Sequence, residues 1–340
     1  MSPISSALLA GQLIRLQMGA ESAWGTKHAA TALLMGATPT PKITPLVKET
    51  AFAHQLGTLE PSFVHAKLQS GGAFTIPGTV TYEEAMILLG WALGTVTPTG
   101  SYTWSNASPL STVPNVQPYT LELGNMGDGA NTDDVVLTGC LPETLKISGE
   151  IGKELTFEVA GFGQQFNTGV QLTGSINYKS PVPEPVLFLG STFSMDPLGT
   201  AAGTTPWTQA LAKFSLEITT GMSAVSTADQ RYPTAWTHKA TAAKLSLTLL
   251  LNHALRGFIT TNLMIDSAGG NQIGAAIRFK AISGAKSFQF DFAGVMDTDP
   301  GLFDSEQEVQ AITVPLSAMY DSTMANHLKT VVVNTVATLP

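Results

Sequence analysis

Two glycine-containing stretches resemble loops that bind nucleotide phosphates, but neither completes its pattern. The segment Gly149–Lys153 contains the Gly-Lys pair of a phosphate loop. That pattern also requires a glycine at position 147 and a hydroxyl residue at position 154, where the chain has Ile147 and Glu154. The stretch Gly161–Gln165 begins like a dinucleotide fingerprint, but Phe166 follows where a third glycine is needed. We interpret the first stretch as a turn and predict no cofactor.

The acidic segment 297–308 is similar to a calcium-binding loop. It begins with Asp297 and carries Glu308 at its twelfth position. Position five is Gly301, where an oxygen ligand is needed, and position six is Leu302, where the loop needs glycine. We interpret it as an ordinary acidic loop, with an adventitious divalent-cation site as the alternative. The six histidines lack the spacing that sets two metal ligands on one helix face, so no metal site is predicted.

The sequence contains no recognisable catalytic nucleophile. Cys140 is the only cysteine, so it forms no internal disulfide, and we expect a buried, inert thiol at a strand end. A carbohydrate-active enzyme on a jelly roll is one alternative, and it needs two carboxylates facing each other across a cleft. Glu158 and Asp291 are both expected on strands, but the sequence does not show that they meet. We predict that the protein is not an enzyme.

The chain contains few charged residues, and this limits how much of its surface can be charged. Charged residues make up 12% of the sequence, against about 25% in typical soluble domains. No charged side chain occurs from Ala85 to Leu121. We therefore expect copies of the chain to cover much of one another's surface. The net charge of −8 and the scattered lysines and arginines do not form the basic stripe of a nucleic-acid-binding protein.

No stretch approaches the ~18 apolar residues that a membrane span needs. Residues 1–20 lack the basic region of a secretory signal, and Arg15 interrupts their apolar run. We expect synthesis and assembly in the cytoplasm, without a membrane partner.

Alternation with period two is the main structural signal. Two neighbouring runs joined by glycines predict an antiparallel hairpin over residues 144–159, with one apolar and one polar face. The apolar set is Leu145, Ile147, Leu155, Phe157 and Val159, and the polar set is Lys146, Ser148, Thr156 and Glu158. Other strands are expected at 63–68, 119–124, 135–140, 214–218, 245–251, 277–281, 288–292, 309–314 and 330–334.

One helix is expected at residues 82–93. Thr81 is placed to cap it and Glu84 follows three positions later, as in a capping box, while Gly94 ends it. We expect its apolar stripe to flank a sheet.

The fold class expected from these elements is mainly β, with two packed antiparallel sheets in a sandwich or partial barrel and one flanking helix. Residues 1–45 would form an N-terminal arm and assembly segment, and 46–180 the first half of the sandwich. Proline-rich residues 181–212 would be a linker, 213–316 the second half, and 317–340 a C-terminal tail. The halves show a weak internal duplication.

The uncharged loop 95–118 is long for a compact domain. Its aromatic residues Tyr102 and Trp104 argue against disorder. We predict that both rings contact a neighbouring subunit.

Several short motifs occur in an order that resembles the major tail tube proteins of long-tailed, siphovirus-like bacteriophages. The N-terminal part Glu21–Thr26 is similar to that family's Glu-x-x-aromatic-Gly-Thr opening. The later motifs are Tyr102-Thr103-Trp104, Pro109-Leu110, Tyr119–Gly124, Gly139-Cys140 and Leu145–Lys153. Together they cover roughly the first half of the chain, and the second half matches only in its strand pattern.

The resemblance implies a structural virion protein of the phage tail. Its copies would polymerise into stacked rings, each closing an inner barrel from six subunits, and DNA would pass through the tube without specific binding. Partners would include tape measure, tail terminator and baseplate or tip proteins. We expect Lys146, Ser148, Thr156 and Glu158 to face the lumen, with carboxylates outnumbering lysines there. Tyr102, Trp104 and Trp24 are the candidate inter-subunit contacts. The alternative is a β-sandwich capsid decoration or host-attachment protein.

Overall fold

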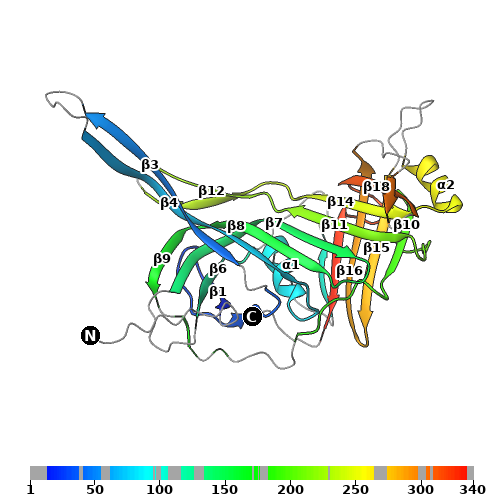
Figure 1. Ribbon diagram of the computed structural model, residues 1–340, viewed down its shortest axis with the longest axis horizontal. Helices are drawn as coiled ribbons and strands as arrows, with labels where there is room; N and C mark the ends of the chain where they lie inside the picture. Colours follow the sequence, from blue (N-terminus) through cyan, green and yellow to red (C-terminus); the bar gives the residue numbers. More distant parts are fainter. Residues whose placement is uncertain are drawn as a thin grey trace.

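The computed structural model describes residues 14–37, 41–54, 62–94, 96, 101–105, 116–125, 134–170, 172–174, 176, 183–228, 230–263, 274–297, 304–306 and 309–334. These residues form mainly antiparallel strands, as expected, together with two helices (Figure 1). The helices are α1 Ala85–Leu93 and α2 His253–Asn262. The strands are β1 Ile14–Ala20, β2 Ala32–Leu33, β3 Lys42–His54, β4 Ser62–Thr79, β5 Tyr102–Ser105, β6 Tyr119–Asn125, β7 Asp134–Glu150, β8 Thr156–Gly163, β9 Gln165–Val170, β10 Thr192–Pro197, β11 Leu211–Thr219, β12 Met222–Val225, β13 Ala235–His238, β14 Ala242–Leu250, β15 Gly274–Ser283, β16 Lys286–Met296, β17 Asp304–Glu306, β18 Val309–Ala318 and β19 Leu328–Val333.

The strands form one large hydrogen-bonded sheet of 17 strands and a separate pair, β12–β13, rather than the two separate sheets expected. A front region runs β3-β4-β8-β7-β11-β14-β18-β17, and a back region runs β10-β15-β16-β19-β5. Gly294–Met296 of β16 pairs with Leu316–Ala318 of β18 and joins the two. A side region contains β2-β1-β6-β7-β9. Among the described strands these pairings close no barrel.

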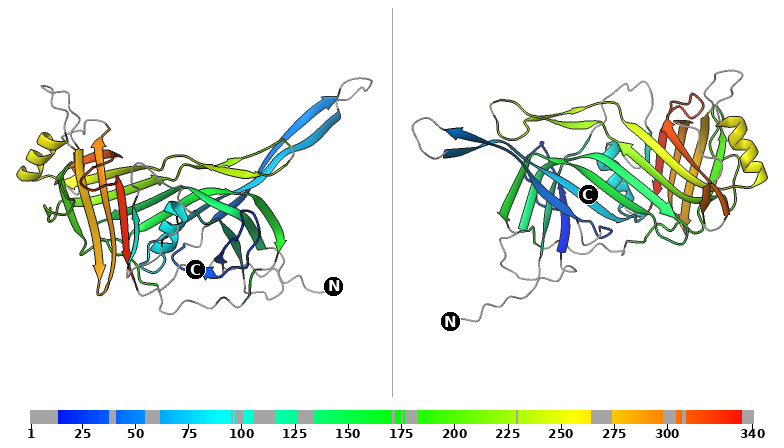
Figure 2. Two further views of the ribbon diagram at one scale, coloured as in Figure 1. Left: turned by 180° about the vertical axis from the view of Figure 1, so that it is seen from behind. Right: turned by 45° about the horizontal axis from the view of Figure 1, so that its top comes forward.

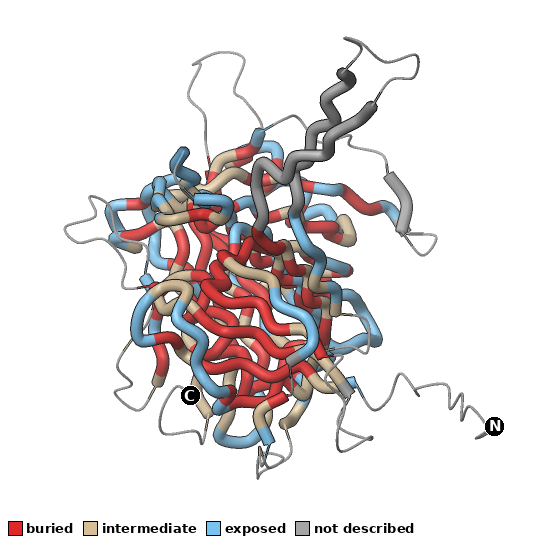
Figure 3. Tube along the Cα trace, turned by 90° about the vertical axis from the view of Figure 1, so that its left-hand side faces the viewer, coloured by how far each residue is buried: buried red, intermediate tan, exposed pale blue. Residues whose placement is uncertain are grey.

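The core lies where the sheet folds back on itself. Phe214 of β11 lies 4.7 Å from Phe279 of β15 and 5.2 Å from Phe290 of β16, measured between ring centroids. In Figure 3 the buried residues, drawn in red, lie along the strands in the middle of the molecule. Packing of two layers is therefore achieved by one folded sheet, because the end of β16 in the back region pairs with the end of β18 in the front region.

Strand β7 is the strand that links the side and front regions. Its first part pairs with β6 and β9, and its second part pairs with β8 and β11. Residues 135–140 and 145–148 were expected to be separate strands, but they belong to this single strand of 17 residues. Gly139 adopts a φ of 65° there, and a register shift occurs between Pro142 and Thr144. These irregularities let the strand bend without ending.

Helix α1 is enclosed by the sheet instead of flanking it. Residues 85–92 are all buried, so the helix has no exposed face to oppose an apolar stripe. Trp91 stacks on Phe74 of β4 with 5.0 Å between centroids, and its indole N–H donates to the carbonyl oxygen of Cys140 at 3.1 Å. The helix begins at Ala85, three residues later than predicted, so its N-cap is Glu84 rather than Thr81. Thr81 Oγ1 accepts the amide of Glu84 in the turn that precedes the helix.

Some elements differ from the expected organisation. The segment 181–212 contains β10, which pairs with β15 along its length, so this part of the expected linker belongs to the sheet. Helix α2 was not predicted, although Asn252 caps it by accepting the amide of Leu255 at 2.8 Å. The expected terminal strand at 330–334 is confirmed in outline by β19.

A long hairpin of β3 and β4 extends beyond the rest of the molecule (Figures 1 and 2). The two strands contain 13 and 18 residues and pair from Lys42 with Thr75 to His54 with Ser62. Strand β8 pairs with β4 only over Gly72–Thr79. Among the described strands, the outer part of the hairpin is therefore paired only with itself.

Candidate interaction face

The four residues predicted to face water on the hairpin 144–159 lie together on the outward side of the front region. Lys146 is directly opposite Glu158, and Ser148 is directly opposite Thr156. Their apolar neighbours Leu145, Ile147, Leu155, Phe157 and Val159 are all buried. The hairpin and its two faces are therefore confirmed, and the position of its polar side in a lumen stays a prediction.

The outward side chains of β8, β7, β11 and β14 continue this surface across the sheet, and we call it the polar face. Strand register arranges them in rows that cross the strands. The charged row is Glu158, Lys146, Glu217 and Lys244. The hydroxyl row is Thr156, Ser148, Ser215 and Ser246. The mixed row is Glu150, Lys213 and Thr248.

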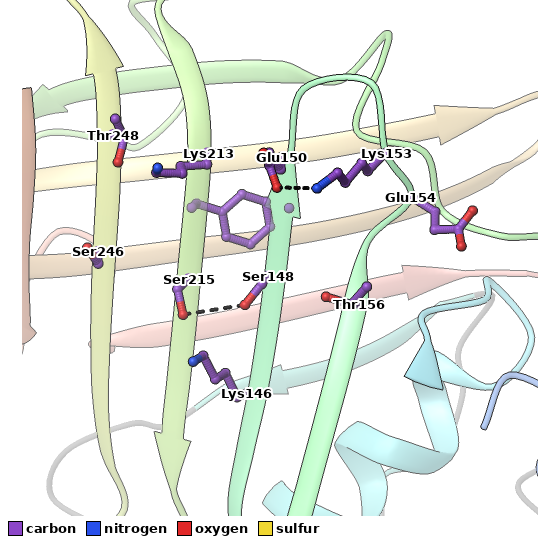
Figure 4. A pocket seen from close by; sticks show the side chains of 12 residues that line it. Lys146, Ser148, Glu150, Lys153, Glu154, Thr156, Lys213, Ser215, Ser246 and Thr248 are labelled. Atoms are coloured by element: carbon purple, nitrogen blue, oxygen red, sulfur yellow. Dashed lines mark hydrogen bonds and ion pairs between the residues drawn. The ribbon is translucent and has the colours of Figure 1, made fainter. Parts of the chain in front are cut away.

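A shallow groove of about 360 Å³ follows the hydroxyl row. Its floor contains Ser148 and Ser215, whose hydroxyl oxygens are 3.4 Å apart. Lys146 lies on one side of this pair, and Lys213 and Glu150 lie on the other (Figure 4). At the rim, Lys153 forms an ion pair with Glu150 at 2.8 Å. The groove is therefore uncharged along its floor and carries both signs of charge along its edges.

The polar face is balanced in charge rather than acidic. Its rows contain the carboxylates of Glu158, Glu217 and Glu150, and the ammonium groups of Lys146, Lys213 and Lys244. The expectation that carboxylates outnumber lysines applies to a lumen; these rows contain equal numbers of the two, and whether they line a lumen stays a prediction. Most of the opposing residues come from distant parts of the chain, so no local pattern shows the balance.

Two candidate inter-subunit contacts belong to the core of the chain itself. Tyr102 and Trp104 are each 2% exposed. They lie on β5, which pairs with β19, and the Trp104 indole N–H donates to the carbonyl oxygen of Gly94 at 2.8 Å. This burial corrects the prediction that their rings contact a neighbouring subunit. A segment without charge indicates burial, but it does not indicate which chain provides the cover.

Trp24, the third candidate, is half-buried. Its indole N–H donates to the carbonyl oxygen of Gly139 at 2.9 Å, and its ring packs against a small cluster that includes Leu141 and Phe162. Part of the ring remains exposed. A contact with another subunit at this position stays a prediction.

Glu21, at the start of the same N-terminal motif, was not predicted to have a role. Its buried carboxylate accepts the amides of Gly25 and Gly139, each at 2.7 Å, and the Thr120 hydroxyl at 2.8 Å. Burial raises the pKa of this carboxyl group above 4.5, against the lowering effect of these hydrogen bonds. The motif thus attaches the N-terminal segment to β6 and β7.

The residues considered for catalysis do not form a reactive site. Cys140 is fully buried, as predicted, and burial raises the pKa of its thiol well above 9. Asp291 accepts two hydrogen bonds from the Arg278 guanidinium, at 2.7 and 2.8 Å, in the back region. Glu158 is exposed on the front region, so the two carboxylates do not share a cleft.

Within the described part of the chain, no three potential ligands group around a common point. Asp297 accepts a hydrogen bond from the Ser317 hydroxyl at 2.6 Å. Most of the acidic segment that follows it lies outside the described residues. Neither described helix is long and apolar enough to cross a membrane.

The sequence was compared with models of known protein families and with curated proteins, and neither comparison gives a match.

Proposed function

We propose that this protein is a structural virion protein whose copies assemble into stacked rings that form the tail tube of a long-tailed bacteriophage. DNA would pass through the tube during ejection without specific binding. Rings of six follow from the family resemblance in the motifs. Tape measure, tail terminator and baseplate or tip proteins are the proposed further partners. The protein would act in the tail of the virion after assembly in the host cytoplasm.

The observation that carries this proposal is the projecting hairpin of β3 and β4. A two-stranded hairpin is at best marginally stable in water without a third strand or a packing partner. Beyond Gly72 of β4, β8 no longer pairs with the hairpin. An exposed pair of strand edges is also a template for pairing with another chain. A hairpin of this length is therefore expected to lie against a partner in the working protein.

A second copy of the same chain is the partner that fits best. Only 12% of the residues are charged, about half of what a soluble domain typically carries. The hairpin projects from one end of the elongated molecule (Figure 2). Contact between this end of one copy and a different part of the next is a heterologous interface. Such interfaces produce rings where the rotation closes and open-ended stacks where it does not.

Deleting the outer hairpin tests the proposal. Residues 49–68 would be removed and Lys48 joined to Gln69, which it pairs with, through an Asn-Gly turn. We expect wild-type protein to form rings or tubes in electron micrographs of concentrated samples. The shortened protein should stay monomeric in light scattering while keeping its thermal unfolding transition, because the deletion removes no residue that pairs with β8.

Two outcomes would contradict the proposal in different ways. A wild-type protein that stays monomeric at high concentration, with tail initiator proteins present, would exclude the tube and favour a decoration or attachment protein. A shortened protein that still forms tubes would exclude the hairpin as the assembly contact.

A further inference from the structure

We propose that the polar face lets a polyanion pass because strand register holds a carboxylate directly opposite each of its lysines. This inference rests on the proposed function, in which the polyanion is duplex DNA. It explains why the polar face would not hold DNA. Each lysine is compensated by a carboxylate on the neighbouring strand, so no acidic surface is needed to repel the phosphates.

Strand pairing supports this for every lysine in the rows. Lys146 on β7 has Glu158 of β8 on one side and Glu217 of β11 on the other. Lys244 on β14 is opposite Glu217. The same geometry recurs in the mixed row, where Lys213 on β11 is opposite Glu150 on β7. Each of the three lysines therefore has at least one carboxylate directly opposite it on a neighbouring strand.

Directly opposite residues on neighbouring strands have Cβ atoms about 4.5–5.5 Å apart, so their side chains interact. A DNA phosphate that approaches such a lysine meets the neighbouring carboxylate as well. Its attraction to the ammonium group is then offset by repulsion at nearly the same distance. Because polyanion affinity rises with each phosphate that a lysine neutralises, compensated lysines should add little to it.

The hydroxyl row strengthens this arrangement. Between the charged row and the mixed row lie only Thr156, Ser148, Ser215 and Ser246, whose side chains are short and uncharged. The groove along this row offers a phosphate only uncharged hydroxyl groups, and water can make the same hydrogen bonds to the phosphate. Phe214 is the one aromatic residue among those that line the groove, and it is 2% exposed, so base stacking has no platform there.

Neutralising the carboxylates tests the inference. The variant Glu158→Gln/Glu217→Gln removes the opposing charges of Lys146 and Lys244. Binding of a fluorescent DNA duplex would be followed by anisotropy over a series of salt concentrations. We expect near-flat salt dependence for the wild type. In the variant, the slope of log affinity against log salt should steepen by roughly 0.9 for each lysine released.

Two further variants separate register from net charge. Glu150→Gln/Lys153→Gln, which leaves Lys213 without its opposing carboxylate and also removes the rim lysine that pairs with Glu150, should steepen the slope independently. Glu306→Gln removes one negative charge on β17, which pairs with β18 and contributes no residue to the rows, and should leave the slope unchanged. Adding Lys146→Gln and Lys244→Gln to the double variant should restore the wild-type slope.

The possible results distinguish this inference from the tube proposal. Unchanged slopes in both glutamine variants would overturn the inference, even where micrographs still show tubes. An equal change in Glu306→Gln would assign the effect to net charge and also overturn it. Failure of the wild type to assemble would overturn the tube alone, since the face is exposed on the single chain and its DNA affinity remains measurable.

Discussion

The indole N–H of Trp104 donates a hydrogen bond to the carbonyl oxygen of Gly94 at 2.8 Å, which ties β5 to the end of α1. Trp104 is 2% exposed and belongs to the core. We therefore expect Trp104→Ala to lower the free energy of unfolding by about 3–5 kcal/mol, as other buried tryptophans do. Urea denaturation measures this directly. Leu189→Ala, at a site that is 79% exposed, is the control and should change it by less than about 0.5 kcal/mol.

A Trp104→Ala protein with unchanged stability but no assembly would support the earlier expectation that this ring contacts a neighbouring subunit.

The Lys286 ammonium group joins the β15–β16 hairpin to the segment before α1. It forms ion pairs with Glu83 at 2.5 Å and Glu184 at 2.9 Å, and the Glu83 side chain is only 2% exposed. Lys286→Met should leave the Glu83 carboxylate buried without its cation and cost about 1.5–3 kcal/mol of stability. Adding Glu83→Gln should recover part of that loss, because the buried group is then neutral. A double-mutant cycle by urea denaturation measures the coupling, and strictly additive effects would exclude it.

Glu21 should make stability depend on pH. Burial raises the pKa of its carboxyl group above 4.5, so the folded state holds the proton more tightly than the unfolded state. The stabilisation linked to that proton is complete below the unfolded pKa and is lost as pH rises through the folded pKa. The advantage of the wild type over Glu21→Gln should therefore shrink as pH rises through the range above 4.5.

Urea denaturation across that range checks the Glu21 prediction, with Glu154→Gln on the surface as the control. A stability difference between wild type and Glu21→Gln that grows with pH would contradict it.

The Cys140 thiol should be unreactive while the chain is folded. It is fully buried, and burial raises the pKa of the thiol well above 9, so little thiolate exists at neutral pH. A thiol-specific chromogenic reagent should label the native protein at the rate of unfolding and the denatured protein at once. Rapid labelling of native protein would place the sulfur at the surface.

The sequence determined the local strands and their faces. Alternation over residues 144–159 predicted both the hairpin and the buried set, because in a strand successive side chains point to opposite sides. A one-residue slip would bury Lys146 and Glu158, so the apolar pattern also excluded such slips in the pairing of β7 with β8. The hydrogen bond between the Glu84 amide and the Thr81 hydroxyl is also local, but it lies in the turn before α1, and the N-cap is Glu84 rather than Thr81.

The tertiary structure decided what covers each apolar segment. The all-apolar helix could have lain on a sheet or against another subunit, and its enclosure depends on Phe74 of β4 and Cys140 of β7, which come from distant parts of the chain. The uncharged segment around Trp104 likewise indicated burial, and Trp104 is also buried within its own chain. Hydrophobicity is non-directional, so it requires burial without selecting the partner.

The tertiary structure also decided how charges meet on the polar face. Lys146 faces Glu217 only because β7 pairs with β11, the strand whose Phe214 packs onto the back region. Local alternation places each of these side chains on an outward face, but it carries no information on which distant strand lies alongside. Strand order is a long-range choice governed by how the whole core packs, and the balance of the polar face follows from it.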